Sequence, residues 1–218
     1  MLARATAMAS GLHLSLFDFA GAEALQSEAR ELGRDVAFAP SVISAGIDSL
    51  LTFARNHEPG RAERLLAETA TAAASTAGWH RWLWQLRLTQ AKAELALERG
   101  AFNEAVASAT DGIKQSRAGG RPKYEALGLI TRSRALQALT RSRDAIGDAV
   151  AAVSVADKVG DPALWLLALD ALIGIDGTDE LATRARAITE RIQECLPDEV
   201  MRRCFTESEV VRRIRGHH

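Results

Sequence analysis

Apolar residues recur at helical spacing along almost the whole chain, in blocks of about 14 to 20 residues separated by short polar turns. The clearest turn is Gly119-Gly120-Arg121-Pro122, and Gly78, Gly100 and Gly160-Asp161-Pro162 mark three others. Glycine is common just after a helix and proline in its first turn, so these residues separate consecutive helices. The blocks lie at about 3–16, 20–33, 40–56, 59–77, 79–99, 102–117, 123–139, 143–159, 163–175 and 178–195.

Four of the turns share a further feature, an alanine a few residues into the helix that follows. These anchor alanines are Ala22, Ala62, Ala105 and Ala145, spaced about 40, 43 and 40 residues apart. A fixed period in this range is typical of helical solenoids, in which each hairpin packs only on its neighbours. We therefore expect an all-α, right-handed superhelical solenoid of about five helix-turn-helix repeats with a short C-terminal capping helix. We expect one domain over 1–215, with repeats at 3–36, 41–77, 79–118, 122–160 and 162–195 and the cap at 197–214.

The composition favours helices and argues against a polyanionic partner. Hydrophobic residues make up 47% of the chain but aromatic residues only 5%, and Ala and Leu supply most of the apolar positions. Because 27 Lys and Arg balance 28 Asp and Glu, nucleic acid is not the expected partner. No apolar run reaches the roughly 20 residues that a membrane span needs. The fourth repeat is locally basic, although nearby acids dilute it; its arginines are Arg132, Arg134, Arg141 and Arg143.

The chain has two cysteines, Cys195 and Cys204, too few for a disulfide scaffold or a zinc site. Each falls at an apolar helical position, which favours inert core thiols in a reduced, cytoplasmic protein. Gly216-His217-His218 resembles the start of an expression tag, so these histidines carry no metal argument.

The residue pattern supplies no catalytic constellation. His13, His57 and His80 are isolated, without a Glu or second His at helical ligand spacing. No glycine-rich phosphate loop with a following Lys and Ser or Thr is present. We therefore expect no enzyme activity, no metal and no cofactor.

The turn Arg99-Gly100-Ala101-Phe102-Asn103-Glu104-Ala105 resembles the Gly-x-aromatic-x-x-Ala signature of tetratricopeptide repeats. The other turns lack its Gly or its aromatic residue, and the period exceeds the usual 34. The departure resembles the longer-helix repeats at the C-terminal ends of large bacterial regulators, either ATPases fused to nucleotide cyclases or signal-transduction ATPases with LuxR-type DNA-binding domains. Similarity is strongest at 80–88, 121–126 and 196–203.

The resemblance implies that the first helix of each repeat lines a concave groove. It maps that groove onto Arg87, Gln90, Glu94, Leu127, Ile130, Arg134 and Gln137 in the third and fourth repeats, and onto Ile47, Leu51 and Arg55 in the second. Apolar positions and arginines together suit a peptide or protein segment, but the same residues are equally compatible with an ordinary solvated helix face. Among the tryptophans, the spacing assigns Trp79 and Trp82 to the core and Trp84 to the binding surface.

From these observations we expect the chain to be a non-catalytic protein-interaction or sensory module of a bacterial regulator. The N-terminal effector domain of that regulator would be an ATPase or a cyclase. The alternative is a sensor domain that binds a small-molecule effector among the helices. The sequence leaves open the identity of the partner and whether the chain forms a homo-oligomer.

Overall fold

The computed structural model describes residues 1–78 and 80–216, and within them every regular element is a helix. The chain divides into two compact units, Met1–Ala101 and Phe102–His218. The boundary falls in the turn of the predicted third repeat. The all-α fold class is therefore confirmed, and the right-handed sense of the array stays a prediction.

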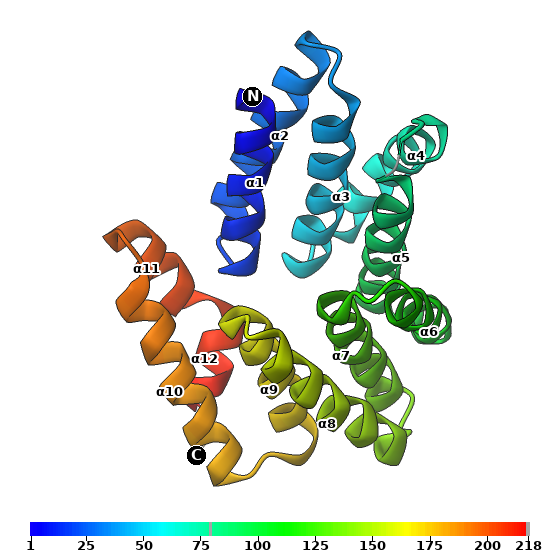
Figure 1. Ribbon diagram of the computed structural model, residues 1–218. Helices are drawn as coiled ribbons and strands as arrows, with labels where there is room; N and C mark the ends of the chain where they lie inside the picture. Colours follow the sequence, from blue (N-terminus) through cyan, green and yellow to red (C-terminus); the bar gives the residue numbers. More distant parts are fainter. Residues whose placement is uncertain (79, 217–218) are drawn as a thin grey trace. The chain divides into compact units, whose positions relative to one another are not determined.

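The first unit is built of antiparallel helices in which each helix packs on the next (Figure 1). First helices also pack side by side, α1 with α3 and α3 with α5. The helices are α1 (Leu2–Ser15), α2 (Phe19–Asp35), α3 (Ala39–Arg55), α4 (Pro59–Ser75) and α5 (Arg81–Glu98).

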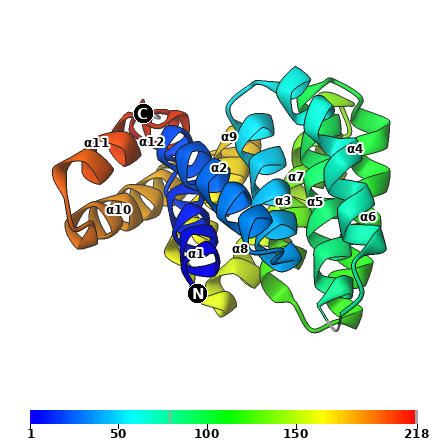
Figure 2. The same cartoon turned by 90° about the horizontal axis from the view of Figure 1, so that it is seen from above.

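Within the second unit the helices pack in the same way, with α7 in contact with α6, α8 and α9. Figure 2 shows α10, α11 and α12 gathered at its C-terminal end, where α12 also contacts α9. The helices are α6 (Phe102–Ala118), α7 (Pro122–Ala138), α8 (Ser142–Val159), α9 (Pro162–Asp176), α10 (Asp179–Cys195), α11 (Glu199–Glu207) and α12 (Glu209–Gly216).

Most turns between helices use one backbone motif with a residue in the left-handed conformation. Gly100, Gly120 and Gly160 occupy this position with φ of 73°, 61° and 73°. Four non-glycine residues adopt it too: Phe17, Ala37, His57 and Thr140. In six of these seven turns, all but the one at Gly160, the N–H of the following residue bonds to a carbonyl five residues back, for example Arg141 to Leu136 at 2.9 Å. This is the Schellman geometry, which reverses the chain within a few residues and brings the next helix alongside.

The anchor alanines are all fully buried, as their period predicted; Ala22, Ala62, Ala105 and Ala145 are each 0% exposed. At Ala145 the close approach of α7 and α8 is visible directly. The Ser133 hydroxyl of α7 donates a 2.8 Å hydrogen bond to the backbone carbonyl of Ala145 in α8. A side chain larger than alanine at this point would push the two helices apart.

The C-terminal cap differs from the prediction, because two short helices replace the single helix expected over 197–214. The chain turns at Ser208, whose ψ is 149°, and α12 starts at the next residue. The Ser208 hydroxyl accepts a 3.4 Å hydrogen bond from the Val211 N–H and so caps α12. Phe205, Val211 and Ile214 are fully buried, which holds both short helices on the unit.

A search of the described helices for one long and apolar enough to cross a membrane found none.

Candidate functional site

The predicted groove residues of the first unit form a polar cluster between α3 and α5. Arg55 of α3 donates two hydrogen bonds to the Glu94 carboxylate of α5, at 2.6 and 2.8 Å. Arg87 of α5 donates a 2.6 Å bond to Asp48 of α3, and Gln90 donates a 2.8 Å bond to Glu94. The four charged side chains are only 13–17% exposed. Arg87, Gln90 and Glu94 therefore do come together, but their polar groups bind their own chain.

These pairs explain why the charges are tolerated below the surface. Burial by itself would lower the pKa of Arg55, but the adjacent Glu94 and Asp48 carboxylates outweigh it and raise the pKa. Both ion pairs join residues 39 positions apart, which is close to one repeat. Removing one partner would leave a poorly solvated charge behind, so the cluster holds neighbouring repeats in register.

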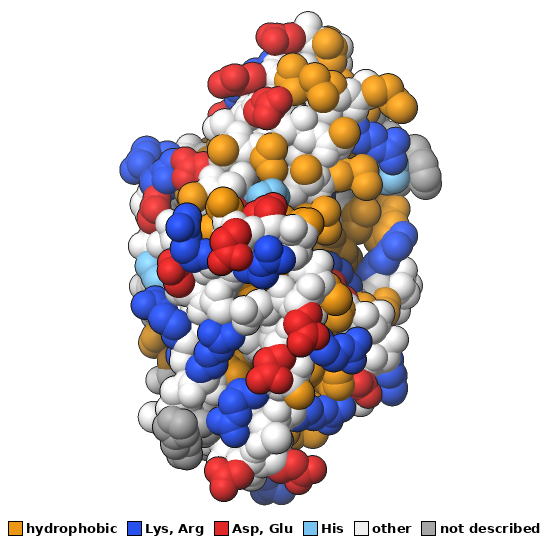
Figure 3. All heavy atoms as spheres, turned by 90° about the vertical axis from the view of Figure 1, so that its left-hand side faces the viewer, with side chains coloured by type: hydrophobic (Ala, Val, Ile, Leu, Met, Phe, Trp, Pro, Cys, Tyr) orange, Lys and Arg blue, Asp and Glu red, His pale blue; other side chains and the backbone are white. Residues whose placement is uncertain are grey.

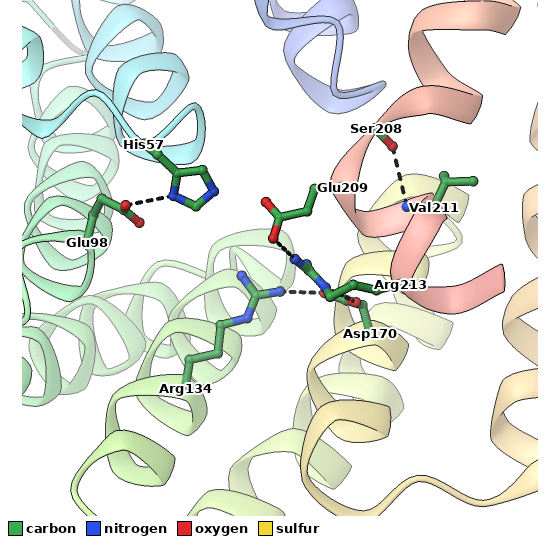
Figure 4. Close-up of polar contacts among 8 residues, drawn as sticks. All are labelled: His57, Glu98, Arg134, Asp170, Ser208, Glu209, Val211 and Arg213. Carbon is green, nitrogen blue, oxygen red and sulfur yellow. Dashed lines mark hydrogen bonds and ion pairs between the residues drawn. The ribbon is translucent and has the colours of Figure 1, made fainter. Parts of the chain in front are cut away.

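In the second unit, Arg134 belongs to a comparable cluster (Figure 4). Asp170 of α9, whose side chain is 6% exposed, accepts a 2.8 Å bond from Arg134 of α7. Asp170 also accepts bonds of 3.0 and 2.8 Å from Arg213 of α12, which in turn binds Glu209. The hydrogen bonds to Asp170 raise the pKa of Arg213. Arg134 is thus part of the contact that fixes α12 to α7 and α9.

The apolar groove positions and the tryptophans need correction. Leu127 and Ile130, expected as pockets for an anchor, are 8% and 4% exposed and belong to the core of the second unit. Gln137 is exposed. Trp84, expected on a binding surface, is 5% exposed and packs in the core, whereas Trp82, expected in the core, is 42% exposed. The two tryptophans have exchanged the expected roles because α5 is apolar on several faces.

The expectation for Trp79 falls on a residue outside the described ones, as do His217 and His218. The expectation for the cysteines can be compared with the structure. Cys195, expected as a core thiol, is exposed, and Cys204 is partly buried.

The histidines remain isolated from one another. His57 lies 2.7 Å from Glu98 (Figure 4), and His13 lies 2.7 Å from Asp18. Over residues 1–78 and 80–216, no three His, Cys, Asp or Glu side chains are grouped so as to hold a metal ion.

An open pocket of about 440 Å³ lies among α6, α7 and the first turns of α8 in the second unit. Its apolar part comes from Val106 and from Leu136, which is 4% exposed and forms a floor. Gly147 contributes no side chain, and a Cβ built there would meet nothing within 4 Å. The complete lining is Val106, Thr110, Arg132, Leu136, Arg141, Arg143, Asp144, Gly147 and Asp148.

Three arginines and two aspartates line this pocket, which leaves a net charge of +1. Arg132 donates bonds of 2.6 and 2.8 Å to Asp148, and these raise its pKa. Arg141 donates to Asp144 at 2.7 Å. Arg143 is exposed and forms no ion pair with any side chain in the described part of the chain. Its guanidinium is therefore the group in the pocket that is available to an anionic ligand.

The basic character of this segment was visible in the sequence as arginines at 132, 134, 141 and 143. The sequence did not show which of these arginines forms no ion pair. Asp148 and Asp170 lie 16 and 36 residues from Arg132 and Arg134, which they bind.

The fold and these surfaces define an all-α protein built of helical hairpins. A scan against models of protein families found no match, and a search of curated proteins found no significant similarity.

Proposed function

We propose that this chain is a non-catalytic interaction module and that the pocket among α6, α7 and α8 binds an acidic segment of a partner protein. The observation that supports this site is Arg143, an unpaired arginine at the rim of an open pocket with an apolar floor. A carboxylate of the partner would accept hydrogen bonds from the Arg143 guanidinium, and a neighbouring aliphatic side chain would cover Val106 and Leu136. The resemblance of the turns to tetratricopeptide repeats of bacterial regulators supports the broader role of coupling partner binding to an effector domain.

The pocket is a better candidate than the first-helix groove that the resemblance implied. Arg87 and Arg134 already bind Asp48 and Asp170, so a ligand would have to displace an intramolecular carboxylate at each of them. Substituting them would also leave those aspartates unpaired, and a loss of binding could then arise from a loss of stability.

The test is a selection of displayed random peptides on the purified chain, followed by affinity measurements on the enriched peptides. We expect peptides in which Asp or Glu lies next to an aliphatic residue. Arg143→Ala should weaken their binding at least about tenfold, the loss of roughly 1.5 kcal/mol expected for a charge-assisted hydrogen bond. Arg203→Ala is the matched control, because Arg203 is an exposed arginine of the same unit outside the pocket. Peptides without an acidic preference, or equal affinity for both variants, would exclude the proposed site.

The pocket volume favours a second candidate function, the binding of a small anionic effector. About 440 Å³ lies within the range of 300–1,000 Å³ that is common for small-molecule sites. A thermal-shift screen of small carboxylates and phosphates separates the two functions. A compound that raises the unfolding temperature of the wild type, but not of Arg143→Ala, would favour the effector.

A further inference from the structure

One face of α1 carries apolar side chains that are open to solvent. Leu2, Met8 and Leu12 are 63%, 67% and 65% exposed, and Ala5 between them is exposed as well. Figure 3 shows hydrophobic side chains gathered in the upper part of the view, over α1 and α2. The buried residues of α1, spaced by three, four and four positions, lie on a different face of the helix and are Ala3, Thr6, Ser10 and Leu14. An exposed apolar stripe of this length on one helix is characteristic of a contact surface.

The repeat register identifies this stripe. The left-handed turn residues Phe17, His57, Gly100 and Thr140 mark equivalent positions, so the first helices α3, α5 and α7 can be aligned with α1. Residues equivalent to Ala5, Met8 and Leu12 are buried in all three of these helices. The residues equivalent to Ala5 are Ala45, Leu88 and Gly128. Those equivalent to Met8 are Asp48, Ala91 and Thr131, and those equivalent to Leu12 are Thr52, Leu95 and Ala135.

A preceding second helix covers these positions. In the first unit, Gln26 of α2 donates a 2.8 Å bond to Thr52 of α3. In the second unit, a Cβ at Gly128 of α7 would lie 2.8 Å from the Ile113 side chain and 3.4 Å from the Ala109 carbonyl, both in α6. The exposed stripe of α1 is therefore the surface on which a helix like α2 or α6 packs elsewhere in this protein.

We propose that this stripe, Ala5, Met8 and Leu12 with Leu2, docks an amphipathic helix of a partner protein whose contact face consists mainly of small residues. Two of the helices that pack in this way, α2 and α6, show such a face at spacings of four, three and four residues. It consists of Ala22, Ala29 and Gly33 together with the longer Gln26 in α2, and of Ala105, Ala109, Gly112 and Ser116 in α6.

Size and charge define the partner helix further. Met8 and Leu12 are larger than Thr131 and Ala135 at the equivalent positions of α7, so small residues opposite them leave the space that they need. The helix α1 contains no acidic residue, and its exposed Arg4 forms no ion pair with the described part of the chain. Acidic residues beside the small-residue face would therefore be favoured.

The probe is a synthetic, end-blocked peptide with the sequence of α2, FAGAEALQSEARELGRD, which has the small-residue face and a net negative charge. It is added to the full chain carrying ¹³C-labelled methionine methyl groups. We expect the Met8 resonance, assigned with Met8→Leu, to shift saturably below about 1 mM peptide. A second peptide, with leucine in place of the alanine that corresponds to Ala29, should produce no saturable shift because the large side chain prevents close packing.

Variants of the chain complete the test. Leu12→Glu should weaken binding of the α2 peptide at least about tenfold while circular dichroism shows an unchanged fold, since Leu12 is exposed. Val150→Glu changes an equally apolar position, 52% exposed in α8, and should bind normally. Equal shifts with both peptides, or equal binding by Leu12→Glu and wild type, would overturn the proposal. A Met8 resonance that shifts with protein concentration alone would overturn it as well, because a second copy would then cover the stripe.

Discussion

At the scale of single residues, the turns place unusual demands on a few side chains. Thr140 has a φ of 59°, a region in which a β-branched side chain crowds its own backbone. Gly100 occupies the equivalent position of the preceding predicted repeat, with a φ of 73°. The backbone motif is thus common to the repeats, whereas the residue that adopts it is not.

Thr140→Gly should stabilise the protein by about 1 kcal/mol, because glycine adopts the left-handed conformation without a steric penalty. Urea unfolding measures the difference. The converse variant, Gly100→Ala, should lose a similar amount. If Thr140→Gly lowers the midpoint, the turn does not carry the strain that its φ indicates.

Gly21 is required by the cap of α2. The Asp18 carboxylate accepts a 3.0 Å bond from the Gly21 N–H and lies 2.7 Å from His13. A Cβ at residue 21 would stand 2.3 Å from that carboxylate and 2.6 Å from the His13 ring. Gly21→Ala should therefore cost about 1–3 kcal/mol.

Gly11→Ala provides the matched control for Gly21→Ala. A Cβ at Gly11 meets nothing within 4 Å, and in the interior of α1 alanine should stabilise the helix by about 0.5–1 kcal/mol. Thermal unfolding of both variants tests the contrast, and equal midpoints would contradict it.

At the scale of helices, close approach depends on the anchor alanines. Ala105→Leu and Ala145→Leu should each cost about 1–3 kcal/mol, because both positions are fully buried and leucine would overfill them. Ala67→Leu, at an exposed position of α4, should change the free energy of unfolding by less than about 0.5 kcal/mol. Wild-type midpoints for both buried variants would show that the repeat register is wrong.

Asp161, at the start of α9, should make the free energy of unfolding depend on pH. Burial alone would raise the pKa of the Asp161 carboxyl, but a 2.9 Å bond from Lys123 and bonds from the Leu164 and Ala163 N–H groups outweigh burial and lower that pKa. Because the folded-state pKa lies below the unfolded one, the contribution is complete above about pH 5, declines as the pH falls through the unfolded-state pKa of about 4, and is lost below the folded-state pKa.

Two variants separate the roles of Asp161. Asp161→Ala should cost about 1–2 kcal/mol at pH 7, and Asp161→Asn less, because an asparagine still caps the helix. Both should show a weaker loss of stability than wild type between pH 5 and about pH 3. Unfolding midpoints measured across that pH range test this prediction. Parallel curves for wild type and Asp161→Asn would show that the Asp161 carboxylate does not cause the loss of stability in acid.

At the scale of the whole molecule, the proposed function is a non-catalytic one. The purified, tag-free protein is expected neither to hydrolyse nucleotides nor to retain a stoichiometric metal, since its sequence has no phosphate-binding loop and its described residues hold no group of three His, Cys, Asp or Glu side chains suited to a metal ion. Metal analysis and a nucleotide-turnover assay test this. One tightly bound metal ion per chain, or turnover above that of a buffer blank, would contradict it.

The sequence by itself determined the helices and their close contacts. Turn signals, with proline or glycine at many of them, placed the ends of the first ten helices to within a few residues, because these residues act on the local backbone. The period likewise identified Ala22, Ala62, Ala105 and Ala145, since small residues are needed wherever two helices meet. The break at Ser208 also had a local signal, a serine three residues before Val211, which the search for one continuous apolar face overlooked.

Only the tertiary structure decided which polar groups were available. Arg87, Glu94 and Arg134 have the chemistry of a binding groove, but carboxylates and arginines 36 to 39 residues away neutralise them. The orientation of Trp82 and Trp84 was decided in the same way, because spacing within one helix does not tell which neighbours will cover it. Local patterns fix where the backbone turns, whereas the pairing of a long charged side chain depends on what packing brings within reach.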